Sequence, residues 1–260
     1  MKNYEIIKTF LDIQRNTMFA ELTSFPFGLM NYSPVEPSPF WNYLLADQIL
    51  KDGEISEIEN YLQSKDRKPN IYFETKLDLA PLKDILQAKG YVFHNEDSWM
   101  FYDTSRSIGI EEFSAVRRVN TEEDLAVWIQ TMDKCYVADD PQNPYGPLGE
   151  NYIDLAQKAW KANHAAGKFE YFTVYKDDEP VAGATLTYQN GLCYISNVGS
   201  MQSVRGEGYG KLATLFCVNE ALKNSVSDVF LATEEGTYPN TFYKKIGFKT
   251  RFTGIGYVKA

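Results

Sequence analysis

Apolar runs and turn signals in the second half of the chain predict a set of neighbouring strands. Three strand-like runs occupy 169–175, 181–188 and 192–200, and the first of them is rich in aromatic and β-branched residues. A polar turn ending in a proline joins the first two runs, and Asn190-Gly191 between the last two is a strong signal for a two-residue hairpin. We therefore expect three consecutive strands joined by hairpins.

Helices are predicted on both sides of these runs. Thr121 is placed to cap a helix that extends to about Met132, and Asp124 stands in the capping-box position where Glu is more usual. Residues 208–223 have a broad apolar face that Asn219 interrupts. In chain order the prediction is strand 113–119, helix 121–132, helix 151–166, the three strands, helix 208–223, strand 228–233, a short helix ending at 246, and strand 248–258.

The first half has a weaker pattern. Residues 4–20 have the spacing of an amphipathic helix, whereas residues 25–40 hold four prolines and several aromatic residues and predict no clear element. Further on, the pattern predicts strand 40–46, helix 55–66, strand 70–74, helix 79–89 and strand 98–103.

Two short segments suggest that the halves are related. Residues 82–91 and 241–248 are each a short helix closed by a glycine and an aromatic residue, between two strands. Two interpretations stay open: an internal duplication, or the general likeness of β-α-β units. Either interpretation fits a boundary at 105–109, which divides the chain into an accessory half at 1–108 and a second domain at 109–260.

Charge and hydropathy argue against nucleic acid and membranes as partners. The chain has 35 acidic and 26 basic residues and a net charge of −9, and an acidic surface repels phosphates. No apolar run approaches the ~20 residues that span a bilayer. The first residues lack the apolar core and cleavage site of a signal peptide. We therefore expect a cytoplasmic protein, with the oligomeric state open.

The cysteines predict neither disulfides nor a metal site. Cys135, Cys193 and Cys217 are widely spaced and form no CxxC pair. With only His94 and His164 as imidazole ligands, zinc would also need carboxylates. We expect three reduced, mostly buried thiols and no bound metal.

The segment from Asn197 to Leu212 carries the clearest chemical signal. Strand 192–200 leads into a loop with glycines at 206, 208 and 210, and the loop opens a helix. Glycine lets the loop amides converge on one point, and the helix N-terminus adds free N–H groups and the positive end of its dipole. This combination suits a diphosphate.

The loop Arg205-Gly206-Glu207-Gly208-Tyr209-Gly210 resembles the acyl-CoA signature of the GNAT acyltransferases, an Arg followed two residues later by Gly-x-Gly. A second hallmark of that family, a Tyr four residues before a Gly-aromatic pair, is matched by Tyr243 before Gly247-Phe248. The resemblance covers residues 112–260. It implies an α/β fold with a mixed central sheet of GNAT type, and the repeated pattern extends this prediction to two tandem GNAT-like halves.

The resemblance also implies roles for individual residues. Tyr243 is the expected acid for the departing CoA thiolate, since the ordinary pKa of a phenol, ~10, is not far above that of a thiol. Glu234 is the expected base, and Glu235 and Asp139 compete for that role. The expected acyl-CoA contacts are Val198, Ser200, Arg205, Gly206, Glu207, Gly208, Tyr209, Gly210 and Lys211.

One position departs from the family pattern. Many relatives have an Asn about seven residues before the Tyr, where this chain has Gly236, and Asn240 stands only three before it. We therefore expect the segment 235–240 to differ from the family in its contacts with cofactor and substrate.

The predicted function is an N-acetyltransferase that moves an acyl group, most simply acetyl, from acyl-CoA directly to a primary amine of a small molecule or peptide. The accessory half and the loop at 139–149 are expected to shape the acceptor pocket, and the accessory half is expected to bind no CoA. One alternative is a non-catalytic acyl-CoA-binding regulatory module. Another is a nicotinamide dinucleotide site, which would need GxGxxG and an acidic residue that ends a second strand, whereas Asp228 is expected to begin one.

Overall fold

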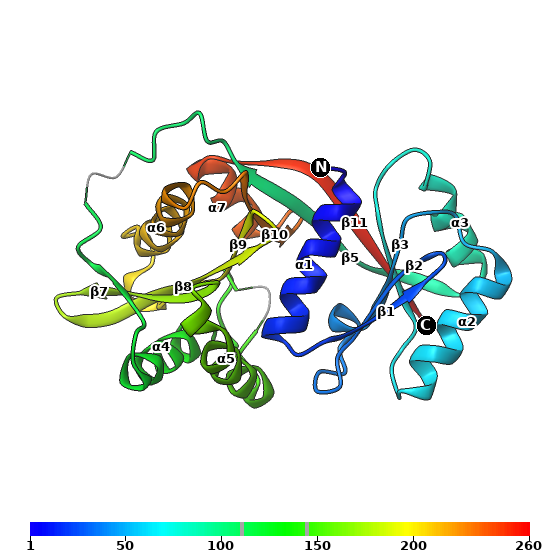
Figure 1. Ribbon diagram of the computed structural model, residues 1–260, viewed down its shortest axis with the longest axis horizontal. Coiled ribbons are helices and arrows are strands. Elements are labelled where there is room, and N and C mark those ends of the chain that lie inside the picture. Colours follow the sequence, from blue (N-terminus) through cyan, green and yellow to red (C-terminus); the bar gives the residue numbers. More distant parts are fainter. Residues whose placement is uncertain (110–111, 144–145) are drawn as a thin grey trace. The chain divides into compact units, whose positions relative to one another are not determined.

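The protein is a mixed α/β molecule, as predicted from the sequence. The structure, a computed structural model, describes residues 1–109, 112–143 and 146–260. Its described strands form one mixed sheet of eleven strands in the order β1-β2-β3-β4-β11-β5-β10-β9-β8-β7-β6, and seven α-helices are described with it (Figure 1).

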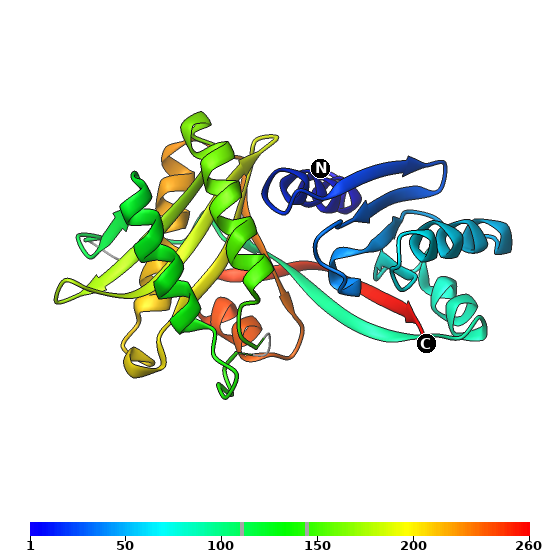
Figure 2. The ribbon, with the colours of Figure 1, turned by 90° about the horizontal axis from the view of Figure 1, so that it is seen from below.

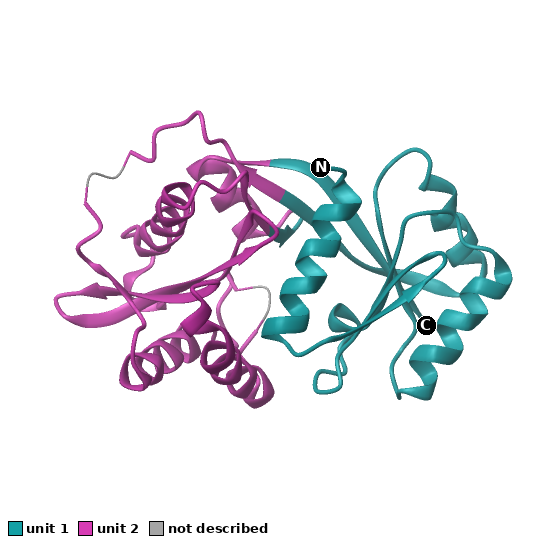
Figure 3. Cartoon of the chain, in the orientation of Figure 1, with its two compact units in different colours: residues 1–99, 232–235, 250–260 teal, residues 100–231, 236–249 magenta. Residues whose placement is uncertain are grey.

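The chain divides into two compact units, coloured in Figure 3. The first unit contains residues 1–99, 232–235 and 250–260, and the second contains residues 100–231 and 236–249. Each unit therefore takes a segment from the other half of the sequence.

In the first unit, helices cover both faces of the strands (Figures 1 and 2). Helix α1 lies on one face, where Phe10 meets the ring of Trp99 edge-on at 5.2 Å. Helices α2 and α3 cover the other face through a core of aliphatic and aromatic side chains, including Leu44, Ile58 and Ile71. The elements are α1 (Asn3–Thr17), β1 (Glu21–Phe25), β2 (Gly28–Tyr32), β3 (Tyr43–Ala46), α2 (Asp52–Ser64), β4 (Asn70–Glu74), α3 (Ala80–Ala88) and most of β5 (Tyr91–Tyr102).

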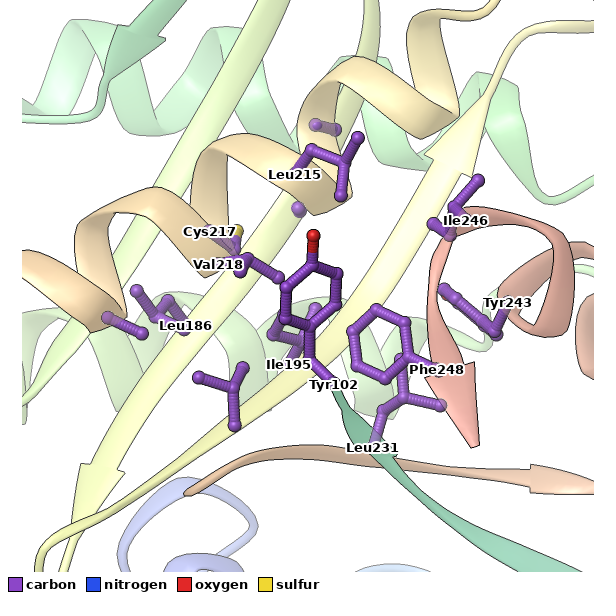
Figure 4. Packing of buried hydrophobic residues seen from close by; sticks show 14 of the residues in the cluster. Tyr102, Leu186, Ile195, Leu215, Cys217, Val218, Leu231, Tyr243, Ile246 and Phe248 are labelled. Atoms are coloured by element: carbon purple, nitrogen blue, oxygen red, sulfur yellow. The ribbon is translucent and has the colours of Figure 1, made fainter. Parts of the chain in front are cut away.

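The second unit has the same layered construction. Helices α4 and α5 pack on one face through Trp128, Trp160 and Tyr171, and α6 and α7 pack on the other (Figure 2). On the α6 side, Tyr102 and Phe248 lie near the middle of the buried cluster shown in Figure 4. The elements are β6 (Val116–Arg118), α4 (Glu122–Cys135), α5 (Glu150–Asn163), β7 (Phe169–Lys176), β8 (Glu179–Gln189), β9 (Leu192–Ser200), α6 (Tyr209–Lys223), β10 (Asp228–Glu234), α7 (Tyr238–Ile246) and β11 (Phe248–Lys259).

The two halves repeat one order of elements and one pattern of pairing. In each half, three consecutive strands pair antiparallel with one another, and after a helix a fourth strand pairs parallel with the third. These strands are β1-β2-β3-β4 in the first half and β7-β8-β9-β10 in the second. Helices α3 and α7 are followed by Gly90 and Gly247, whose φ angles of 81° and 113° are left-handed as expected for helix-ending glycines.

The last strand of each half is exchanged. Strand β11 of the second half pairs antiparallel with β4 of the first, joining Gly254 to Glu74 and Val258 to Asn70. Strand β5 of the first half lies beside β10 of the second. Met100 and Tyr102 of β5 are buried in the core of the second unit, and Tyr257 of β11 is buried in the core of the first.

The sequence prediction missed parts of the first half. Residues 25–40 contain most of the β1-β2 hairpin, in which Phe25 pairs with Gly28. Strand β5 begins at Tyr91, well before the predicted residue 98, because the polar run at 94–97 interrupts its apolar pattern. The predicted loop at 139–149 includes residues 144–145, which lie outside the described residues. No described helix is both long and apolar enough to cross a bilayer.

Candidate active site

The site begins where β9 departs from β10. The two strands pair in parallel from Leu192 to Tyr194 only, in the part of the chain that the structure describes. Strand β9 continues beside β8 to Ser200, which pairs with Ala182. The rest of β9, including the predicted Val198 and Ser200, therefore has an edge that the β10 ladder does not use.

A bulge in β9 accompanies this departure. The register with β8 shifts between Gly183 and Thr185, where Asn197 adopts a left-handed φ of 51°. The side chain of Asn197 fixes this conformation: its Oδ1 accepts from the Tyr152 hydroxyl, and its Nδ2 donates to Thr185 Oγ1 at 3.1 Å. Polar side chains thus stabilise a bend that the backbone ladder alone would not.

Helix α4 packs tightly against the bulged strand. A Cβ on Gly199 would lie 2.8 Å from Cys135 Cβ and 3.0 Å from Tyr136 Cε2, so a larger residue would force the helix away. The hydroxyl of Tyr136 donates to the carbonyl of Val198 at 3.3 Å. Cys135 and Tyr136 thus connect the end of α4 to the β9 edge.

The loop after β9 presents a group of unpaired amides. The N–H groups of Arg205 and Glu207 donate to Gln202 and Val204 within tight turns. Among the described residues, no acceptor is present for the five N–H groups of Gly206, Gly208, Tyr209, Gly210 and Lys211.

Glycine is required at two loop positions by the backbone and not by crowding. Gly206 and Gly208 have φ angles of 84° and 95°, and a Cβ on either would meet nothing within 4 Å. Gly208 also caps α6 without any side-chain hydrogen bond, so the helix N-terminus is open. The loop is a nest of donors beside the positive end of a helix, as the sequence predicts.

A pocket of about 300 Å³ lies against this loop. Eight of the predicted residues line it: Val198, Ser200, Arg205, Gly206, Gly208, Tyr209, Gly210 and Lys211, together with Tyr243. Gln142 and Asn143, from the loop at 139–149 that the sequence analysis expected to shape the acceptor pocket, also line it. The sequence did not single out the other lining residues, which are Cys135, Tyr136, Gly199, Val204, Tyr238, Pro239 and Phe242. The nearest signal was the adjacency of Phe242 to Tyr243 and of Gly199 to Val198 and Ser200.

Two charged residues of the loop are paired with protein groups. Glu207 is exposed, does not line the pocket, and binds Lys176 at 2.7 Å. The guanidinium of Arg205 holds the carboxylate of Asp140, whose side chain is only 2 % exposed. Burial alone would raise the pKa of Asp140, but hydrogen bonds from Arg205 and the Gln142 amide outweigh it and bring the pKa below its usual value.

Tyr243 lies on α7 at the pocket wall and is 8 % exposed. Its ring contacts Phe242 and Phe248 at centroid distances of 5.0 and 5.7 Å, so packing restricts its orientation (Figure 4). Asn240 is buried one turn earlier, and its Nδ2 contacts Met100 Sδ at 3.7 Å. Asn240 does not line the pocket, so it does not replace the Asn missing at position 236.

The three carboxylates considered as the base, Glu234, Glu235 and Asp139, are not among the residues that line the pocket. Glu234 is the last residue of β10 and belongs to the first unit, where His94 and Asp97 are its electrostatic neighbours. Glu235 accepts a hydrogen bond from Ser98, and Asp139 is exposed on the loop after α4. The role of Glu234 stays a prediction.

All three cysteines are free and buried, as expected. Cys135 is the one among them that lines the pocket. Its Sγ contacts the Val181 carbonyl, and burial raises the pKa of the thiol to about 12. Among the described residues, no three His, Cys, Asp or Glu side chains are grouped closely enough to hold a metal ion.

The bulged strand β9 leads into an open amide nest at the start of α6, an arrangement suited to an anionic ligand. The model of the Acetyltransferase (GNAT) family matches residues 130–248. These residues therefore form a GNAT-family domain, and the resemblance predicted from the two motifs is confirmed. The family is one of acetyltransferases, and acyl transfer is the reaction class that it supports.

Solved structures share the fold along nearly the whole chain. A GCN5-related N-acetyltransferase from Kribbella flavida superposes with a TM-score of 0.67 at 15% identity, covering 98% of this chain and 95% of that one. A tandem GNAT protein from the clavulanic acid biosynthesis pathway gives 0.61 at 12% identity, covering 99% and 95%. A functionally unknown conserved protein from Staphylococcus epidermidis gives 0.67 at 11% identity, covering 93% and 94%.

A comparison with curated protein sequences found no match. The solved structures establish the fold, and the GNAT-type mixed sheet predicted from the sequence is confirmed. The dinucleotide alternative is wrong in its fold, because β7, β8 and β9 are antiparallel and a doubly wound dinucleotide domain is built from parallel strands.

Proposed function

We propose that the protein is an N-acyltransferase that moves an acyl group, most simply acetyl, from acyl-CoA to a primary amine. The observation that carries the proposal is the set of five amides, of Gly206 and of residues 208–211, for which the described part of the chain offers no acceptor at the open end of α6. Unpaired donors are costly unless water or a ligand satisfies them. A diphosphate offers several acceptor oxygens to such a nest.

The residues present fit the diphosphate arm of coenzyme A. Gly206 and Gly208 are open on the side where a Cβ would stand, so a ligand can approach the backbone closely. Lys211, on the first turn of α6, is exposed at the pocket and has no ion-pair partner among the described residues. It can add a positive charge to the amides.

The bulged end of β9 supports a role in holding the thioester arm. Residues 195–200 lie beyond the β9-β10 ladder, so their outer edge can hydrogen-bond a pantetheine amide. Val198 and Ser200 are the residues that we assign to this role, and both line the pocket. An amide at Val198 would polarise the thioester carbonyl.

Acyl-CoA supplies an activated carbonyl whose C–S bond breaks as the C–N bond to the amine forms. In this proposal Tyr243 donates its phenolic proton to the departing sulfur, and the proton lost by the amine leaves through a base or water. The buried position of Tyr243 among aromatic rings keeps its hydroxyl in a restricted orientation. Glu234 remains our proposed base, and the acceptor is a small-molecule or peptide amine.

The environment of Cys135 favours direct transfer over an acyl-cysteine intermediate. Cys135 is at the pocket, but with a pKa raised to about 12 its sulfur is protonated near neutral pH. The thiolate is the nucleophilic form of cysteine. A ternary complex of enzyme, acyl-CoA and amine is therefore the better-supported route.

The alternative is an acyl-CoA-binding module without turnover. The departure of the segment 235–240 from the family pattern favours this alternative. A screen of amine acceptors with acetyl-CoA, following release of free thiol, tests the two. We expect thiol release with at least one amine, whereas CoA binding without any release would support the binding module.

A matched pair of glycine variants tests the cofactor site. Gly208 and Gly191 both have left-handed φ angles, 95° and 76°, and both face open space. Gly208→Ala and Gly191→Ala therefore carry similar backbone strain. By calorimetry we expect only Gly208→Ala to weaken CoA binding, by about tenfold, because tilting a single amide removes one charge-assisted hydrogen bond. No CoA binding by the unmodified protein would overturn the proposal.

A further inference from the structure

The first residue of the loop motif has an unusual set of partners. Arg205 Nε donates to the Ser200 carbonyl at 3.2 Å, and Nη1 donates to Asp140 Oδ1 at 2.7 Å and to Gln142 Oε1 at 3.1 Å. Its Nη2 binds the other carboxylate oxygen of Asp140. These contacts use all but one of the guanidinium donors. The side chain therefore has little capacity left for a phosphate.

The positive charge of Arg205 is also neutralised within the protein. Asp140 is nearly fully buried, and the same pair lowers its pKa, so the carboxylate is ionised at neutral pH. A buried ion pair with two parallel hydrogen bonds is strongly directional. Breaking one partner of such a pair leaves an uncompensated charge.

Asp140 belongs to a turn that reaches the pocket. Its carboxylate accepts from the Gln142 amide at 2.9 Å, and its carbonyl accepts from the Asn143 amide at 3.0 Å. Gln142 and Asn143 both line the pocket. Arg205 therefore ties the end of β9 to a turn, residues 140–143, that forms another part of the same wall.

We propose that Arg205 is a positioning residue. Through Asp140 it fastens the 140–143 turn to the loop at 205–211, a role that we call the tether. CoA binding at the loop and the ordering of the 140–143 turn are therefore coupled. This inference rests on the proposed function, because it assumes that CoA occupies the loop. The diphosphate charge is then met by the five free amides and Lys211, and not by Arg205.

The two possible roles of Arg205 predict opposite effects of the substitution Asp140→Asn on CoA affinity. If Arg205 were a phosphate ligand, Asp140→Asn would free the guanidinium of Arg205 to bind phosphate and would remove a negative group near an anionic ligand. CoA would then bind equally well or more tightly. If Arg205 is the tether, the same change loosens the wall and weakens CoA binding. We expect about a tenfold loss, within the range of coupling between contacting residues.

The control is Asp133→Asn, which removes one exposed acidic charge from α4 that has no ion-pair partner among the residues that the structure describes. Equilibrium CoA affinity is measured by calorimetry for each variant. Arg205→Lys provides an independent test, because lysine keeps the charge but loses the bidentate geometry. If Arg205 acts as the tether, Arg205→Lys and Asp140→Asn should reduce CoA affinity by similar factors. The variant that carries both substitutions should show no further loss of affinity.

Hydrogen exchange gives a readout that a general loss of stability would not mimic. CoA should slow exchange at residues 140–143 in the unmodified protein, and this protection should be lost in Asp140→Asn while the loop amides at 206–211 remain protected at saturating CoA. In kinetics, KM for the acyl donor should rise with kcat nearly unchanged.

The outcomes separate this inference from the proposed function. If the unmodified protein does not bind CoA, both fail. If it binds CoA but Asp140→Asn binds as tightly as Asp133→Asn, or more tightly, the tether is wrong and the proposed function stands. If near-ultraviolet circular dichroism shows that Asp140→Asn is unfolded, Arg205→Lys decides: affinity equal to that of the unmodified protein overturns the tether.

Discussion

Gly254 on β11 lies directly against the phenol of Tyr72 on β4. A Cβ at position 254 would overlap the hydroxyl and lie 2.7 Å from Cε1 of the ring. That hydroxyl accepts a hydrogen bond from Trp99 Nε1 at 2.9 Å, and Tyr72 is only 4 % exposed. The exchanged strand therefore fits the first unit because it has no side chain at this position.

We expect Gly254→Ala to reduce the free energy of unfolding by about 1–3 kcal/mol, because the ring must move within a packed layer. Gly53→Ala is the matched control: Gly53 lies in α2, and a Cβ there would meet nothing within 4 Å. Alanine at that position should be neutral or stabilising. Urea unfolding of both variants checks this, and equal stability of the two would contradict the close fit.

The carboxyl of Asp97 makes the stability of the first unit depend on pH. Burial raises its pKa from 3.8 to about 6, although hydrogen bonds from Tyr72 and Asn95 oppose the shift and Glu234 adds to it. The folded protein thus holds this proton more tightly than the unfolded chain. The resulting stability is complete below the ordinary pKa and is lost as the pH rises through about 6.

Asp97→Asn should remove that dependence. The difference in unfolding free energy between the unmodified protein and the variant should fall by up to about 3 kcal/mol as the pH rises from about 4 to about 7. Urea titrations at a series of pH values measure it. A difference that stays constant over this range would mean that the pKa of Asp97 is not raised.

Removing the exchanged end of β11 should unfold the first unit. A chain that stops before Thr250 loses the antiparallel partner of β4 and the buried ring of Tyr257. We expect loss of the cooperative transition of that unit in denaturant unfolding, while removal of Ala260 alone, beyond the β4 ladder, should have a small effect. An unchanged transition in the longer truncation would show that the pairing with β11 is dispensable.

Tyr243→Phe should slow turnover about 100-fold if its hydroxyl protonates the leaving thiolate, the size typical of general acid catalysis. CoA affinity should hardly change, because the ring and its aromatic contacts remain. Tyr188→Phe is the control, since its hydroxyl contacts Asn224 outside the pocket. Thiol release at saturating acyl-CoA measures the effect. Equal rates for both variants would remove Tyr243 from the mechanism.

Local signals explain what could be predicted from the sequence. The Asn190-Gly191 turn, the glycines of the loop and the Thr121 capping box each act within a few residues, and the elements that they predict are present. The loop and Tyr243 line one pocket, and the order of elements predicted from the sequence brings them together.

Non-local pairing explains what could not be predicted. Nothing in β11 or β5 distinguishes a partner in the same half from one in the other half, so the exchange was not foreseen. The β1-β2 hairpin turns through Pro26-Phe27, which lacks the usual turn chemistry. Asp140 lies in a loop without periodicity, so its pairing with Arg205 had no sequence signal.

The exchange of β11 sets the timing of folding on the ribosome. Strand β4 is synthesised early, but one of its edges stays unpaired until the last strand in chain order has been made. The nascent first half therefore exposes an open strand edge, a recognised starting point for aggregation, while the second half is translated. The half that is made first is therefore completed last.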